Sequence, residues 1–118
     1  MRLKEQRKEG FTIILVTGVD NGQLDISNIK QLKQKFNRLI EKKIDKIAIN
    51  LKDVKYIDSS TVGFFVDAFN TLRNSNGKFA LLNVDKKIIE ILDMTNLTKF
   101  LPIYNEKEFF QRVKNNEI

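Results

Sequence analysis

Three short apolar runs, separated by segments of helical periodicity, constrain the fold of this chain more than any other feature. The runs are rich in β-branched residues, as buried strands are, and they cover Phe11–Thr17, Lys46–Leu51 and Phe79–Val84. The segments between them repeat apolar residues every three or four positions, which predicts amphipathic helices. Strands that alternate with helices favour right-handed crossovers and a parallel sheet.

Smaller elements complete the predicted fold. Leu3–Lys8 alternates poorly and is expected to be a frayed first strand, and Thr98–Tyr104 holds a last strand around Pro102. Because proline cannot donate to a ladder, that last strand is expected at an edge. The fold class is therefore α/β, with a mixed, mostly parallel sheet of four to five strands and about four helices. A length of 118 residues predicts a single domain over 1–118.

Capping and turn residues mark where the helices begin and end. The expected helices run from a cap at Ser27 or Asn28 to about Lys43, from a cap at Asp58 or Ser59 to Asn74, from Asp85 to Met94, and over Glu106–Lys114. The turn that ends the second helix includes Gly77, a residue that suits a positive φ angle.

The composition excludes several kinds of site. The chain has no cysteine and no histidine, so disulfides, Cys nucleophiles, Ser-His pairs and the commonest metal ligands are all absent. Its aspartates lack the spacing of a dedicated metal site. We therefore expect no cofactor, no metal and no enzymatic activity. No apolar run is long enough for a membrane span or a signal peptide, which predicts a cytoplasmic protein without a membrane partner.

The net charge of +6 is concentrated in one segment. Residues 30–46 hold seven basic residues and two acidic ones. Their apolar neighbours recur at helical spacing, so the charges fall mostly on the solvated face of an amphipathic helix. Such a face could hold phosphates or anionic lipid. No aromatic residues interleave with the lysines to stack bases, so we do not expect direct nucleic-acid binding.

The stretch Tyr56–Gly63 carries the clearest functional signal. It places Asp58, Ser59 and Ser60 where a buried strand gives way to an amphipathic helix. The free N–H groups and the positive dipole end of a helix N-terminus favour an anion there, so a hydroxyl at this position is well placed to carry a phosphate. The alternative is that these residues only cap the helix, and the two roles are compatible.

The chain resembles the STAS family, a domain shared by sulfate transporters and anti-sigma factor antagonists. The resemblance runs roughly from Phe11 to Phe110, and three pieces carry it: Ile47–Gly63 with its Asp-Ser-Ser site, Gly77–Val84, and Ile88–Phe100. In stand-alone family members the serine after the aspartate accepts a phosphate, which implies Ser59 here. The resemblance implies an anti-sigma factor antagonist. Its unphosphorylated form would bind an anti-sigma factor that is also a serine kinase and so free a sigma factor. Phosphorylation of Ser59 would switch this binding off, and a phosphoserine phosphatase would restore it.

The site departs from the family pattern at one position. Thr61 stands where the family usually has glycine, whereas the second glycine is kept as Gly63. The β-carbon of Thr61 restricts how closely the backbone of a partner can approach, and its hydroxyl is a second candidate phosphoacceptor. The family's Gly-x-Leu-Asp turn is matched by Gly22–Asp25, but Asp20 competes with Asp25 for the place at the site.

One aromatic residue is expected beside the switch. If the helix buries Val62, Phe65, Val66, Phe69 and Leu72, then Phe64 is largely exposed and can anchor a partner. The alternative is that Phe64 packs under a loop or the C-terminal helix. The residues expected to contact the partner are thus Asp25, Asp58, Ser60, Thr61 and Phe64. The alternative function is a STAS subunit of a scaffold, or of a lipid or anion transport complex, without phosphorylation control.

Overall fold

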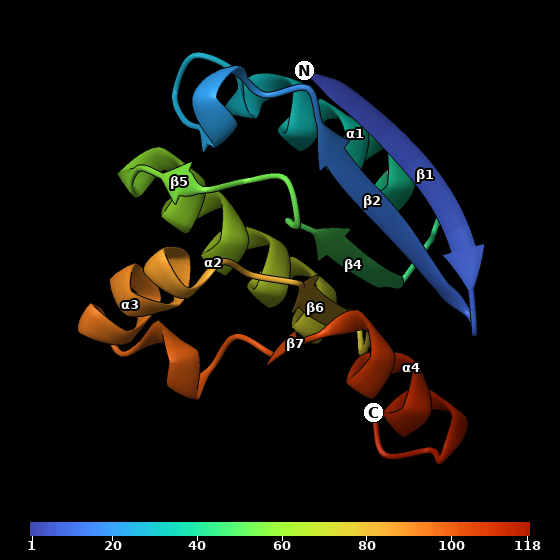
Figure 1. The fold of residues 1–118 in the computed structure, drawn as a ribbon. Helices are drawn as coiled ribbons and strands as arrows, with labels where there is room; N and C mark the ends of the chain where they lie inside the picture. Colours follow the sequence, from blue (N-terminus) through green and yellow to red (C-terminus); the bar gives the residue numbers. More distant parts are fainter.

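The computed structural model describes all residues from 1 to 118 and contains a five-stranded sheet in the order β1-β2-β4-β6-β7 (Figure 1). Its strands are β1 (Arg2–Lys8), β2 (Phe11–Thr17), β4 (Lys46–Asn50), β6 (Lys78–Leu82) and β7 (Ile103–Tyr104). β1 pairs antiparallel with β2, and all the other pairs are parallel. The predicted mixed, mostly parallel sheet is confirmed.

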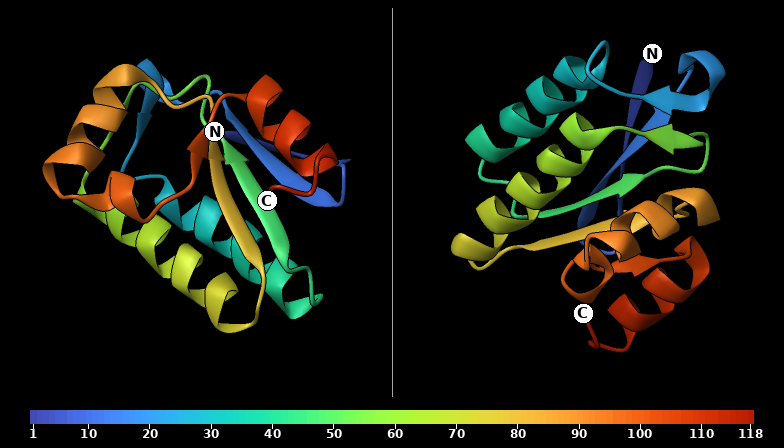
Figure 2. Two further views of the ribbon diagram at one scale, coloured as in Figure 1. Left: turned by 90° about the horizontal axis from the view of Figure 1, so that it is seen from below. Right: turned by 90° about the vertical axis from the view of Figure 1, so that its left-hand side faces the viewer.

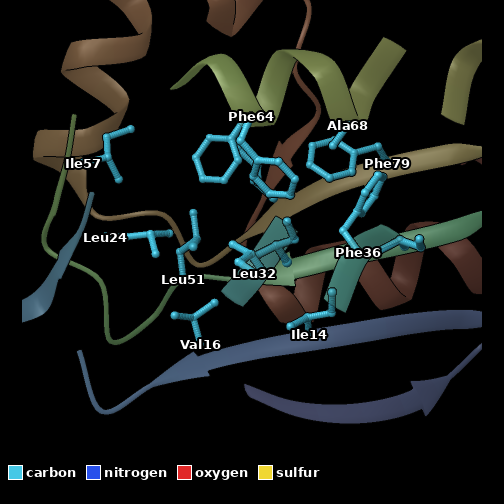
Figure 3. Close-up of a cluster of buried hydrophobic side chains, with 14 of the residues drawn as sticks. Ile14, Val16, Leu24, Leu32, Phe36, Leu51, Ile57, Phe64, Ala68 and Phe79 are labelled. Atoms are coloured by element: carbon cyan, nitrogen blue, oxygen red, sulfur yellow. The ribbon is translucent and has the colours of Figure 1, made fainter. Parts of the chain in front are cut away.

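Helices cover both faces of this sheet (Figure 2). The helices are α1 (Ile29–Glu41), α2 (Ser59–Asn74), α3 (Lys86–Met94) and α4 (Glu106–Lys114), with short 3-10 turns at Asp20–Gly22 and Leu97–Lys99. The first three helices enclose a cluster of 21 buried residues on one face, part of which is drawn in Figure 3. The fourth packs its Phe109 and Phe110 against five buried residues of the sheet on the opposite face. The predicted helices are all present.

A second, two-stranded sheet escaped the sequence prediction. It pairs β3 (Gln23–Leu24) in parallel with β5 (Tyr56–Ile57). Two residues are too few to show any periodicity, which is why the pattern did not reveal these strands. Because β5 leads directly into α2, this small sheet brings the segment after β3 to the start of α2.

β1 is a charged strand at the edge of the main sheet, and the expectation that it frays is wrong. It pairs with β2 along its whole length, from Arg2 opposite Thr17 to Lys8 opposite Phe11. Its backbone is therefore satisfied on one side although its side chains are mostly exposed. Glu5 forms an ion pair of 2.6 Å with Lys35 of α1.

Three element ends differ from expectation. β7 spans two residues because a 3-10 turn occupies the first part of the predicted last strand, although its edge position is confirmed. α1 ends before Lys43, which adopts a positive φ of 65°. Asn76 rather than Gly77 takes the positive φ after α2. Gly77 is required for a different reason, since a β-carbon there would collide with the carbonyl of Asp45.

Candidate functional site

The start of α2 is organised by the carboxylate of Asp58, which is the N-cap residue. Its Oδ1 accepts hydrogen bonds from the Thr61 N–H at 3.1 Å and from the Ser60 hydroxyl at 2.6 Å. Its Oδ2 accepts the N–H of Ile26 at 3.0 Å. Both oxygens are therefore bonded within the chain, and the predicted cap at Asp58 is confirmed.

These hydrogen bonds fix the charge of Asp58. Burial by itself would raise the pKa of this carboxyl group, but the hydrogen bonds from Ser60, Thr61 and Ile26 outweigh burial and hold the pKa below its ordinary value. Asp58 is therefore ionised at neutral pH. The site carries a fixed negative charge directly before Ser59.

The three consecutive hydroxyl groups after Asp58 differ in their surroundings. Ser59 is exposed, and no hydrogen bond within the chain engages its Oγ. Ser60 is half-buried and donates to Asp58. Thr61 is fully buried, with an exposed fraction of 0%, and its Oγ1 donates to the Leu24 carbonyl at 2.7 Å. Ser59 is thus the one hydroxyl of the three that is free to react.

Thr61 therefore lies beneath the surface, and the expectation that it contacts a partner directly is wrong. Its hydroxyl has one proton, and the shorter contact to Leu24 takes it in preference to Asp58 Oδ1, which lies 3.2 Å away. Buried polar groups need such a partner, so the side chain turns inward rather than outward.

Asp25 lies at the site, in the segment between β3 and α1. The residues on both sides of it, Leu24 and Ile26, bond to the first turn of α2. Its own carboxylate accepts from the N–H of Ser27 at 3.0 Å and from the Ser27 hydroxyl at 2.6 Å. No hydrogen bond joins Asp20 to α2, so of the two candidate aspartates the structure brings Asp25 to the site.

Phe64 is buried, with an exposed fraction of 5%, and the prediction of an exposed aromatic is wrong. Its ring lies 5.6 Å from that of Phe36 in an edge-to-face arrangement, and Figure 3 shows it pointing into the core. The buried face of α2 runs through Thr61, Phe64, Phe65, Ala68 and Leu72. The helix is thus rotated relative to the prediction because its first turns pack against α1 as well as the sheet.

Sequence reasoning missed one apolar residue at this surface. Ile26 is 72% exposed, and its backbone is bonded to Asp58. The signal that could have found it is an isoleucine in a polar turn, directly after Asp25 and before Ser27. Gly63 is also exposed, one helical turn after Ser59, and a β-carbon built on it meets no atom within 4 Å.

Two further observations bear on other kinds of function. No group of three or more acidic side chains comes together in an arrangement that could hold a metal ion. None of the four helices combines the length and the apolar character needed to cross a membrane.

Residues 4–110 of the chain match the family model of the STAS domain. The chain belongs to the STAS domain family. The candidate site of this STAS chain lies beyond the carboxyl end of β4, a place where ligands and partners of parallel sheets commonly bind.

Relatives of this STAS chain have a consistent naming. The anti-sigma-B factor antagonist of Bacillus subtilis is 32% identical over 87 residues, which cover 74% of this chain and 79% of that protein. The crystal structure of a proposed anti-sigma factor antagonist from Thermotoga maritima superposes with a TM-score of 0.82 at 28% identity, covering 95% of this chain and 94% of that one.

The fold is also that of the Bacillus anti-sigma factor antagonist SpoIIAA, whose structure is known in an unphosphorylated and a phosphorylated form. Both are 21% identical to this STAS chain. The unphosphorylated form has a TM-score of 0.76 and covers 97% of each chain. The phosphorylated form has a TM-score of 0.70 and covers 95% of this chain and 99% of the other.

Proposed function

We propose that this chain is an anti-sigma factor antagonist and that phosphorylation of Ser59 switches its binding off. The observation that carries the proposal is the state of the Ser59 hydroxyl, which is exposed and unbonded at the first residue of α2. The names of its relatives and the two known phosphorylation states of SpoIIAA support the same assignment.

The chemistry of the step follows from the position of Ser59. A serine kinase would transfer the γ-phosphoryl group of ATP to Oγ, so that an O–P bond forms, the bond to the β-phosphate oxygen breaks with its electron pair, and the hydroxyl proton passes to a base. The N–H groups of Ser59 and Ser60 have no acceptor within the chain and can bind phosphate oxygens, whereas the Thr61 N–H is already bonded to Asp58. The helix dipole favours the added charge at this end.

The proposed switch acts by charge at a surface. A phosphoserine adds about −1.5 to −2 charges at neutral pH. Because Asp58 is already ionised and bonded within the chain, the new charge adds to an existing one instead of replacing it. A partner that fits the hydroxyl form then meets a phosphate beside an ionised carboxylate, and removal of the phosphate by a phosphatase restores binding.

Gly63 supports a docking role for this face of α2. A glycine inside a helix destabilises it by roughly 0.5–1 kcal/mol relative to alanine. The chain itself has no need of that glycine, since the position is exposed and a β-carbon there would meet open space. The missing side chain instead allows the backbone of a partner to approach close to Ser59.

The proposal is tested by affinity capture from a lysate of the native cell. Wild type, Ser59→Ala and Ser59→Asp serve as baits, and Asn37→Asp on the exposed part of α1 controls for an added negative charge away from the site. We expect wild type, Ser59→Ala and Asn37→Asp to retain a serine kinase of the anti-sigma type and Ser59→Asp to lose it. Incubation of that kinase with ATP and wild type should modify Ser59 alone, as mapped by mass spectrometry.

Two results would contradict the proposal. If all four baits retain the same proteins equally, Ser59 is only part of a helix cap, and co-purification of a membrane transporter would then favour a subunit role. If the kinase modifies Ser60 instead of Ser59, the hydrogen bond between Ser60 and Asp58 does not protect that hydroxyl, and the assignment of the phosphate is wrong.

A further inference from the structure

The segment Leu24–Ile26 is attached to the start of α2 at two points. The buried hydroxyl of Thr61 donates to the Leu24 carbonyl at 2.7 Å, and the Ile26 N–H donates to Asp58 Oδ2 at 3.0 Å. Within the segment, the Leu24 carbonyl accepts one bond and the Ile26 N–H donates the other, so the two attachment points flank Asp25. The backbone of this segment is thereby held against the residue that precedes Ser59.

Thr61 makes the more protected of the two attachments. Its side chain is completely buried, whereas the Ile26–Asp58 bond is exposed to solvent. A hydrogen bond away from water is stronger and more costly to lose than one that water can replace. The glycine that the family usually carries at this position has no hydroxyl and could not make this bond.

The consequence of the double attachment is a fixed backbone at an exposed apolar residue, Ile26, next to the start of α2. Ile26 is 72% exposed, although a large apolar group gains nothing from contact with water. Its β-branched side chain has few rotamers, and its backbone is bonded next to Ser59. A partner that binds it therefore pays little of the entropy that ordering a mobile loop would cost.

We propose that Ile26 is the apolar contact of the partner surface and that Thr61 is the positioning residue that holds it beside Ser59. This inference rests on the proposed function, and its occupant is the anti-sigma factor of that proposal. The partner must offer an apolar pocket for one isoleucine next to the position that receives the Ser59 hydroxyl. The two residues are exposed on either side of one carboxylate, because Asp58 accepts the Ile26 N–H and directly precedes Ser59 in the chain.

The positioning role is tested first, without any partner. Thr61→Val removes the hydroxyl at nearly constant shape, and Thr61→Ser keeps it. By hydrogen exchange under native conditions, we expect the Ile26 amide to exchange at least tenfold faster in Thr61→Val than in wild type and to be restored in Thr61→Ser. The amide of Ala48 in the central strand serves as the internal reference for overall stability. Unchanged exchange at Ile26 in Thr61→Val would overturn the positioning role.

The docking role is tested with the purified anti-sigma kinase identified by capture. We expect Ile26→Ala to weaken its binding at least tenfold with an unchanged melting temperature, and Thr61→Val to weaken it while Thr61→Ser does not. Ile89→Ala, at an exposed isoleucine of α3, should bind as wild type does.

Full affinity of Ile26→Ala for a kinase that rejects Ser59→Asp would overturn this inference and leave the proposed function standing. If no partner distinguishes Ser59→Asp, the proposed function fails and the docking role of Ile26 fails with it, while the exchange result still decides the role of Thr61.

Discussion

Asp58 stabilises the site through three of its neighbours at once. It caps α2 through Thr61, accepts the Ser60 hydroxyl and holds Ile26. Its ionised form makes these bonds best, which is why its pKa is lowered in the folded chain. A single side chain thus sets both the geometry and the charge of the surface around Ser59.

Replacement of Asp58 should therefore cost stability in a pH-dependent way. We expect Asp58→Asn to be about 1 kcal/mol less stable than wild type near neutral pH, because asparagine still caps α2 but its single amide oxygen cannot accept from both Thr61 and Ile26. Because the folded pKa lies below the unfolded value of about 3.9, this contribution is fully present above that value and is lost as the pH falls through the folded pKa. Urea unfolding between about pH 7 and pH 3 measures both effects.

The control for this experiment is Asp53→Asn, at an exposed aspartate that makes no side-chain hydrogen bond. We expect it to track wild type to within about 0.5 kcal/mol over the same pH range. A gap between Asp58→Asn and wild type that stayed constant down to the lowest pH would show that the charge of Asp58 contributes nothing to stability.

At the scale of the element, the orientation of α2 decides what each of its residues does. Its buried face includes Phe64, whose ring packs against Phe36 of α1 and Phe65. The helix thus packs against α1 within the main core. Around the site, its exposed face carries the small residues Ser59 and Gly63.

This orientation predicts a large effect at Phe64 on stability. Truncating a buried phenylalanine to alanine costs about 3–5 kcal/mol, so Phe64→Ala should lower the free energy of unfolding by that amount. Phe100→Ala removes a ring that is 62% exposed and should change it by less than about 0.5 kcal/mol. Chemical denaturation of both variants tests the difference, and equal stability of the two would refute the assigned orientation.

The sequence predicted the elements with strong periodicity and missed those without it. The alternating strands and helices, the cap at Asp58 and the edge position of β7, which follows Pro102, are predictable from local chemistry. Which face of α2 is buried does not follow from local chemistry. Apolar residues occupy all but one of the positions from Val62 to Val66, so two orientations of the helix are compatible with the sequence. Only the packing of α1 against α2 selects between them.

The candidate site was predictable only in part for a similar reason. Asp58 and Ser59 are adjacent in the sequence, and their roles are local. The contact between Thr61 and Leu24 joins residues 37 positions apart. The pairing of β3 with β5, two strands of two residues each, brings them together. No local pattern encodes such a contact. The isoleucine in a polar turn is visible in the sequence, but neither the burial of Thr61 nor the bond between Ile26 and Asp58 could be predicted from it.

At the scale of the whole molecule, the site stands apart from the main sheet. It is built on the two-stranded sheet and the first turn of α2, beyond the carboxyl end of β4. The 21-residue core lies beneath it and does not include Ser59. A charge added at Ser59 should therefore leave the core unchanged.

Hydrogen exchange of Ser59→Asp measures this expectation. Amides of β2, β4 and β6 should keep the protection they have in wild type, and changes should be confined to residues 23–28 and 58–63. The melting temperature should stay within about 4 °C, since an acidic residue at a helix N-terminus contributes only about 0.3–1 kcal/mol. Ser59→Ala is the uncharged control. Loss of protection in the central strands would mean that the switch works by refolding.

The charged edge strand β1 also affects whether copies of this chain associate with one another. An antagonist that acts by binding must be made in amounts comparable to its target, so its copies meet one another often. The unpaired side of β1 would invite one copy to extend the sheet of the next, but its row of lysine and arginine side chains repels a second identical strand. The charged edge strand thus keeps copies of this chain apart even where the proposed function would require many of them.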